Sequence, residues 1–328
     1  MLSKPQPVLT QMPWNVKKLI VDSANSSIKM SLRQSSKDFK ELVDRANFRY
    51  KKVGIDLVYN KIIISVMLTG VHSLFCFHFQ RQANGYLRSE ENNEYRLVPQ
   101  GDFITAAVNQ LRKIVENRRI SIDTFTIDVS VIYFSLPSLL SCLSDAFASL
   151  DHKLKARTFE VLSFSQESVI PAILPHLEPG TLESLEFKVA DRVTPTHHRH
   201  LNLNNVISME QFNRAKRLNL QFSTNLSPEN VKHFQYFSVL VERLTLDYVK
   251  TIIENALQNS ELDTIYIYYD TAEYLNIYDY IIQLDDKIYS GEIIPPGSPQ
   301  DDFWFEFKTN PSKHFYISLS RYHLYRLN

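Results

Sequence analysis

The residues that could do chemistry in this chain are few and lie far apart. His197, His198 and His200 are close enough in sequence to hold a metal ion, but they follow Pro195 in a polar stretch that is typical of a loop. Metal sites need ligands that are fixed by secondary structure and by a second layer of hydrogen bonds. No paired cysteines or further histidine motif accompany them. We therefore expect no bound metal.

Nucleophilic and nucleotide-dependent chemistry have little support in the sequence. Cys142 lies in an apolar stretch, where a buried structural thiol is expected. Ser163 lacks the neighbouring glycines of a nucleophile elbow. The seven glycines of the chain are too widely spaced to cradle a phosphate. The sequence thus predicts a protein that is not an enzyme and that needs no cofactor.

Composition favours a folded protein with a sizeable core. The chain has 328 residues, of which 44% are hydrophobic and 12% aromatic, and its net charge is zero. Only two cysteines, Cys76 and Cys142, are present, which suits a reducing compartment. The start of the chain has no apolar signal region, and the longest apolar run, 62–68, is too short to span a bilayer. We expect a cytoplasmic and/or nuclear protein without a membrane partner.

Hydrophobic periodicity divides the chain into five segments. Pro13, Ser36, Ser208 and Ser227 are placed to begin helices, Ser208 in a capping box with Gln211, and a polar stretch at 81–93 is expected to form an exposed loop within a β-rich region. Apolar residues at helical spacing predict one helix of the array, at Ile104, Ala107, Val108, Leu111 and Val115. The expected segments are a flexible tail at 1–11, three short helices at 12–50, a β-rich connecting region at 51–100, a strand–helix array at 101–290, and a loop with two closing strands at 291–328.

A loose L-x-x-L-x-L repeat runs through the predicted strand–helix array. Its matches are spaced by 34, 26, 33, 26 and 21 residues, which is irregular but near the 20–29 residues of leucine-rich repeats. Each strand–helix unit must stack on its neighbours to cover its apolar face. We predict an α/β fold with three N-terminal helices, a small β meander and an irregular leucine-rich-repeat-like array; an ordinary α/β sheet is the alternative. The matches begin at Ile122, Ala156, Leu182, Ala215, Val241 and Leu262.

Strand alternation predicts which side chains of the array point away from its core. A residue between two apolar positions of one strand lies on the opposite face. Tyrosines at such positions suit an interface, because they combine a large contact area with a polar group. A solvated face without a partner is the alternative. The candidate target-binding residues are Glu160, Glu186, Asn219, Thr245, Tyr266 and Tyr268.

Two sets of residues carry a resemblance to a known family. Met12-Pro13, Val16, Ile20, Leu32-Arg33 and Leu42-Val43-Asp44 follow the pattern of an F-box. The stretches 164–187, 207–220 and 227–246 are similar to an FTH-type domain, and ILPHLEPGTLESLE is the most specific of them. The chain therefore resembles a nematode group of F-box proteins that carry a C-terminal FTH-type domain of leucine-rich-repeat character.

The resemblance implies a non-catalytic substrate-recognition adaptor of a Skp–cullin–F-box ubiquitin ligase. Its partners would be a Skp-type linker protein, a cullin bound through that linker, and an unknown protein target. Ala24, Ser26 and Ser35 depart from the family pattern, and shortening a buried apolar contact typically costs about 2–5 kcal/mol. The residues expected to contact the linker are Met12, Pro13, Val16, Ile20, Met30, Leu32, Leu42 and Val43.

Two other functions remain open. One is a protein-interaction scaffold that does not dock to a ligase, which the three departures favour. The other, less favoured, is a nucleic-acid or ribonucleoprotein adaptor, because residues 1–60 contain 11 lysines and arginines against 5 acidic residues. No RRM or KH signature accompanies these basic residues, so nucleic acid is an unlikely partner on the sequence alone.

Overall fold

The chain forms two compact units in the computed structural model. Unit 1 comprises Met1–Thr158 and His176–Thr181, and unit 2 comprises Phe159–Pro175 and Leu182–Asn328. From residue 288 onward the description is of the backbone alone. The structure describes residues 11–321 apart from 25, 46–47, 70–73, 91–93, 130–135, 164–165, 189–199, 260, 285–287, 294–301 and 311–312.

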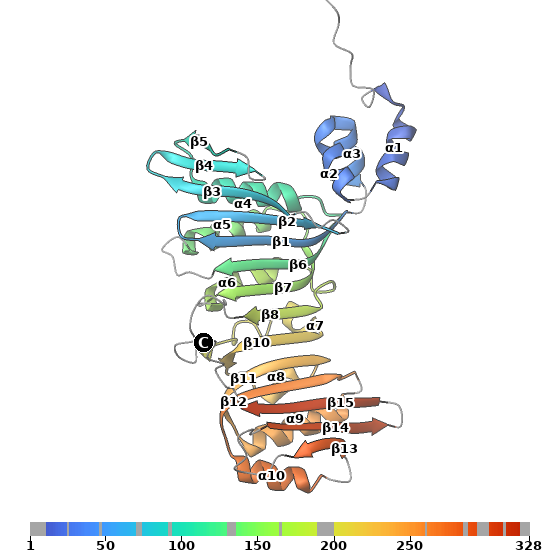
Figure 1. The fold of residues 1–328 in the computed structure, drawn as a ribbon, viewed down its shortest axis with the longest axis vertical. Helices are drawn as coiled ribbons and strands as arrows, with labels where there is room; N and C mark the ends of the chain where they lie inside the picture. Colours follow the sequence, from blue (N-terminus) through green and yellow to red (C-terminus); the bar gives the residue numbers. More distant parts are fainter. Residues whose placement is uncertain are drawn as a thin grey trace, which may run out of the picture. The chain divides into compact units, whose positions relative to one another are not determined.

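Unit 1 begins with three short helices, drawn in blue in Figure 1. They are α1 (Trp14–Ser23), α2 (Ser26–Ser35) and α3 (Lys37–Arg45). The Ser36 side-chain oxygen accepts a hydrogen bond from the Phe39 backbone N–H at 3.3 Å, so Ser36 begins α3 as the sequence predicts. None of the helices is long enough to be stable alone. Their shared core is formed by Val21, Leu32, Phe39, Leu42 and Val43, which are all buried.

An antiparallel meander follows the helices. Strand β1 pairs with β2, and each later strand up to β5 pairs with the one before it; β1 also pairs in parallel with β6. Apolar side chains alternate along β2, where every second residue from Ile62 is buried against the helices of this unit. The bounds are β1 Phe48–Val58, β2 Lys61–Leu68, β3 Leu74–Gln82, β4 Gly85–Glu90, β5 Arg96–Pro99 and β6 Ile120–Val129.

The expected loop at 81–93 is wrong, because most of its described residues belong to strands. Strand β3 continues to Gln82, which pairs with Gly85 across a two-residue turn. Gly85 has φ 143°, and a Cβ atom there would lie 2.1 Å from the Val98 carbonyl oxygen. The polar composition misled the prediction because β4 lies next to the edge strand of the sheet, where few side chains need to be apolar.

Helix α4 (Phe103–Val115) covers one face of the meander and packs on β2, β3 and β4. The Asp102 carboxylate caps it by accepting from the Thr105 backbone N–H at 2.8 Å. Helix α5 (Leu136–Ala148) packs on α4. The apolar stripe predicted for α4 is buried throughout, at Ile104, Ala107, Val108, Leu111 and Val115.

Unit 2 is built on parallel strands. The order is β8, β10, β11, β12 and β15, with parallel pairing throughout, followed by antiparallel β14 and β13. The two closing strands predicted near the C-terminus are therefore present, and β15 extends the parallel part. The bounds are β7 Lys155–Ser163, which is shared with unit 1, β8 Ser184–Lys188, β9 His200–Leu201, β10 Arg217–Thr224, β11 Tyr236–Leu244, β12 Thr264–Ala272, β13 Ile288–Ile293, β14 Asp302–Asn310 and β15 Lys313–Arg321.

Helices cover one face of these parallel strands (Figure 1). Ile252 and Ala256 of α9 line a small pocket together with Phe237 of β11 and Ile265 of β12. No helix in the described part of the chain is both long and apolar enough to cross a membrane. The bounds are α6 Gln166–Ile173, a 3₁₀ turn Leu174–His176, α7 Glu210–Arg214, α8 Pro228–Val231, α9 Leu246–Gln258 and α10 Tyr274–Ile282.

Two predicted helix starts in unit 2 had different outcomes. Ser227 begins α8 with Pro228 in the first turn, as expected, and it also forms a capping box with Asn230. The capping box predicted at Ser208 is wrong, because α7 starts only at Glu210. The side-chain amide of Gln211 instead donates to the Pro175 carbonyl oxygen at 3.1 Å, in a buried position.

Two carboxyl groups lie side by side on the face of the unit 1 sheet that α4 does not cover. Parallel pairing of β1 with β6 places Asp56 beside Asp128. Burial, reinforced by the charge of Asp128 and opposed by Lys52, raises the pKa of Asp56 from 3.8 to about 6. Between about pH 4 and 6 the folded chain therefore holds a proton that the unfolded chain has released. The free energy of unfolding decreases as the pH rises through that range, because the folded chain must then carry a buried charge.

We predict that Asp56→Asn stabilises the protein at neutral pH by about 1–3 kcal/mol, because the amide carries no charge to bury. The variant should also lose much of the decline in stability between about pH 4 and 6. Urea denaturation of the full chain across this pH range measures both effects. Asp263→Asn, at an exposed position, is the matched control. Equal pH profiles for Asp56→Asn and the wild type would contradict the assignment.

Candidate functional site

The N-terminal helices expose a stripe of apolar side chains. Val16 and Leu19 of α1 are 37% and 67% exposed, and Ile20 beside them is half-buried. Because these residues are three and four apart, they share one side of the helix. Pro13 is exposed at the start of α1, and its carbonyl oxygen accepts from the Val16 backbone N–H at 3.0 Å. We call Pro13, Val16, Leu19 and Ile20 the α1 stripe.

The opposite side of α1 is fixed to α3. The Lys17 ammonium lies 2.6 Å from the Asp38 carboxylate, and the Lys17 side chain is only 4% exposed. The same ammonium lies 6.0 Å from the centre of the Phe39 ring. Val21, one turn further along, is buried with Lys17. These contacts hold α1 in the orientation that turns the α1 stripe outward.

The predicted linker-contact residues divide into surface and core. Pro13 and Val16 are exposed, and Met12 and Ile20 are half-buried. Leu32, Leu42 and Val43 belong to the shared core of the three helices, and the Met30 side chain lies outside the described residues. Of the positions that depart from the family pattern, Ala24 ends α1, and the Ser35 hydroxyl donates to the Leu32 carbonyl oxygen at 2.7 Å.

In unit 2, the uncovered face of the parallel strands presents a row of polar side chains. Strand register places Glu186 of β8 beside Asn219 of β10, Asn219 beside Ser238 of β11, and Ser238 beside Tyr266 of β12. Their sequence neighbours Leu185, Phe187, Leu218, Leu220, Phe237, Val239, Ile265 and Ile267 are all buried. The predicted alternation of side chains is therefore present across four strands.

A lysine joins two carboxylates at one end of this row. The Lys188 ammonium lies 2.9 Å from the Glu160 carboxylate and 2.6 Å from that of Glu186. Burial alone would lower the pKa of Lys188, but the hydrogen bonds and charges of the two glutamates outweigh it and raise the pKa above its ordinary value. Lys188 is therefore charged at physiological pH and holds both glutamates in place.

Aromatic side chains occupy the next part of the face. The Arg217 guanidinium lies 4.8 Å from the centre of the Tyr236 ring, and the Tyr236 and Tyr266 ring centres are 5.9 Å apart. Burial, together with the nearby Tyr266, raises the pKa of Tyr236, so its hydroxyl stays neutral and able to donate. Tyr268 is half-buried two residues further along β12. We call Glu160, Glu186, Lys188, Arg217, Asn219, Tyr236, Ser238, Tyr266 and Tyr268 the strand face.

One predicted residue of this face is wrong. Thr245 follows β11 and caps α9, where its hydroxyl oxygen accepts from the Tyr248 backbone N–H at 3.2 Å. The repeat predicted to begin at Val241 lies later in the chain than the pattern that the strand follows, which begins at Phe234. Phe234, Phe237 and Val239 are the buried residues at the matching positions, which makes Ser238 the corresponding face residue. An L-x-x-L-x-L pattern that also accepts phenylalanine at its apolar positions identifies this set of residues.

Three further members of the strand face were missed: Lys188, Arg217 and Tyr236. Each lies at the beginning or end of its strand, outside the short pattern that was searched. Period-two alternation extended in both directions from Glu186, Asn219 and Ser238 would have identified them.

Among the residues that the structure describes, the side chains first considered for chemistry are not brought together. His197 and His198 lie outside the described residues, and His200 is exposed in β9, 3.8 Å from Glu242. Within the described ranges, no three histidine, cysteine or acidic side chains are grouped closely enough to hold a metal ion. Cys142 is only half-buried, contrary to the expected buried thiol, and burial raises its pKa.

Carboxylates partly neutralise the basic residues among positions 1–60. Besides the buried Lys17, Arg45 forms an ion pair with Glu41, and Arg49 lies 2.6 Å from Asp123. Pairing of this kind lowers the positive charge that could contact phosphates.

Comparison with known proteins gives one match. Residues 137–280 match the family model of the FTH domain. The match runs from α5 into α10 and includes every residue of the strand face, whereas the α1 stripe precedes it. No curated protein matches the chain, and no solved structure does so.

We predict that Lys188→Met destabilises unit 2 by about 1–3 kcal/mol at neutral pH, because it leaves two half-buried carboxylates without their cation. Urea denaturation at neutral pH measures the change, and Lys216→Met, at an exposed position, is the control. Equal losses for the two variants at neutral pH would show that Lys188 holds nothing in place.

Proposed function

We propose that this chain is a non-catalytic substrate-recognition adaptor of a Skp–cullin–F-box ubiquitin ligase. Helices α1–α3 would act as the F-box and bind a Skp-type linker protein, which connects to the cullin. The FTH domain would bind the protein target through the strand face. The observation that carries the proposal is an FTH domain preceded by a three-helix segment with apolar side chains in solvent.

The α1 stripe supports linker binding on physical grounds. Exposed apolar side chains gathered on one side of a helix are costly in water and are typical of an interaction surface. Helix-in-groove recognition uses anchors spaced as Val16, Leu19 and Ile20 are. Leu32, Leu42 and Val43 would then act indirectly, by keeping the three helices packed.

The strand face supports target binding in a similar way. It combines tyrosines and an arginine, which are enriched in protein interfaces, with carboxylates and amides that can fix orientation. Glu160, Glu186 and Lys188 are pre-positioned by ion pairs, so binding costs less side-chain entropy. The target itself would be a protein whose surface complements neighbouring acidic and aromatic groups.

We predict that Val16→Asp and Leu19→Asp each abolish co-purification of the full chain with a Skp-type linker protein, since each places a charge in the apolar contact. Both residues are exposed, so the fold should be retained, as circular dichroism would check. Asn15→Asp adds the same charge at an exposed position of the same helix and should bind normally.

Failure of the wild-type chain to bind any Skp-type linker would contradict ligase docking and would favour an interaction scaffold. Normal binding by both Asp variants would show that the linker, if bound, does not use the α1 stripe.

A further inference from the structure

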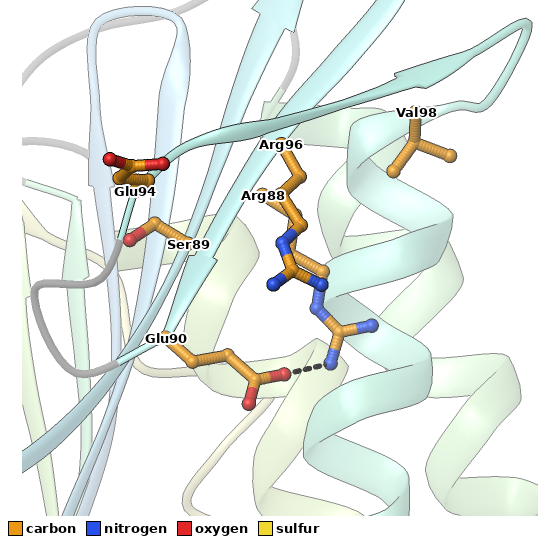
Figure 2. Close-up of a pocket in the computed structure, with 6 residues that line it drawn as sticks. All are labelled: Arg88, Ser89, Glu90, Glu94, Arg96 and Val98. Carbon is orange, nitrogen blue, oxygen red and sulfur yellow. Dashed lines mark hydrogen bonds and ion pairs between the residues drawn. The ribbon is translucent and has the colours of Figure 1, made fainter.

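A cavity of about 640 Å³ lies at the edge of the unit 1 sheet (Figure 2). It lies beside the end of β4, which continues to Glu90, whereas the pairing with β5 reaches only as far as Arg88 and Arg96. A polar cavity of this size can admit a small ligand or the head of a larger one. Its lining residues are Arg88, Ser89, Glu90, Glu94, Arg96 and Val98.

Two arginines stand directly opposite each other in this cavity. The register of β4 and β5 pairs Arg88 with Arg96. Figure 2 shows both side chains extending in the same direction from the two strands. Like charges at directly opposed positions repel each other and destabilise a sheet. Counter-charge from the protein or from a ligand would therefore stabilise such a pair.

Within the described residues, a carboxylate pairs with only one of the two arginines. Arg88 forms an ion pair with Glu90 and lies 3.5 Å from the side-chain oxygen of Gln110 on α4. Its Nε is buried and has no hydrogen-bond partner. Arg96 is exposed and makes no ion pair within the described part of the chain, and Figure 2 shows the Glu94 carboxylate directed away from both guanidinium groups.

We propose that this cavity binds a phosphate group, either free or as a phosphate monoester. A planar guanidinium donates two parallel hydrogen bonds to phosphate oxygens, and two adjacent guanidiniums match the double charge of a phosphate better than the single charge of a carboxylate. The group would bind between Arg96 and Arg88 and would compete with Glu90 for the Arg88 guanidinium. This site is independent of the proposed ligase role, because it uses neither the α1 stripe nor the strand face.

The test is calorimetric titration of the full chain with inorganic phosphate, phenyl phosphate and acetate at constant ionic strength. Both phosphates should bind the wild type, and acetate should bind much more weakly. A preference for phenyl phosphate over inorganic phosphate would identify a monoester as the natural ligand; the reverse would identify free phosphate.

Variants with opposite expected effects sharpen the test. Arg96→Gln should weaken phosphate binding by about 10- to 100-fold, the usual worth of a charge-assisted hydrogen bond. Glu90→Gln should strengthen binding several-fold, because it releases Arg88. Arg214→Gln, which removes one positive charge from an exposed site in unit 2, should leave the affinity unchanged.

The proposal would be overturned if the wild type bound neither phosphate compound, or if Arg96→Gln and Arg214→Gln bound phosphate alike. Neither result would affect the proposed binding of a Skp-type linker, which is measured separately.

Discussion

The constraint on which the rest of unit 2 depends is that helices cover only one face of the parallel strands. The buried side of each strand is then apolar, and burial of those side chains supplies most of the favourable free energy of folding. Alternation leaves the other side free to carry polar and aromatic groups. Neighbouring strands share one register, so Glu186, Asn219, Ser238 and Tyr266 form a continuous row. The strand face is thus a consequence of the packing and needs no separate scaffold.

The α1 stripe depends on a comparable separation within unit 1. One side of α1 is fixed by Lys17 to Asp38, and the residues on its other side are left in solvent. A lysine is seldom buried unless it is paired. The ion pair orients α1 at least as much as it stabilises the three helices, because desolvating a lysine offsets much of the favourable interaction with its partner.

Much of the fold could be predicted from the sequence, because local signals agree with the packing. The stripe on α4, the Ser36 cap of α3 and the closing strands all depend on residues that are close in sequence. Errors arose where the local signal was weak or ambiguous. Strand β4 is polar because it lies near a sheet edge, and the Thr245 assignment failed because Val241 also fits the repeat in a different frame.

The detailed composition of the candidate sites could not be predicted in the same way. Lys188 meets Glu160, which is 28 residues away along the chain, only because β7 and β8 are neighbours with a particular register. Arg88 and Arg96 are opposed only because β4 and β5 pair in one particular register. Alternation indicates the face on which a residue lies, but register decides its neighbours, and register depends on contacts distant in sequence.

In the proposed adaptor role, the chain binds a Skp-type linker through its first helices and keeps the strand face available for a target. Hydrogen–deuterium exchange of the full chain, measured with and without the linker protein, tests both parts of this role together. We expect slower backbone exchange in α1 and its immediate neighbours, with unchanged exchange in β8, β10, β11 and β12. Slower exchange confined to the strand face, with α1 unaffected, would contradict it.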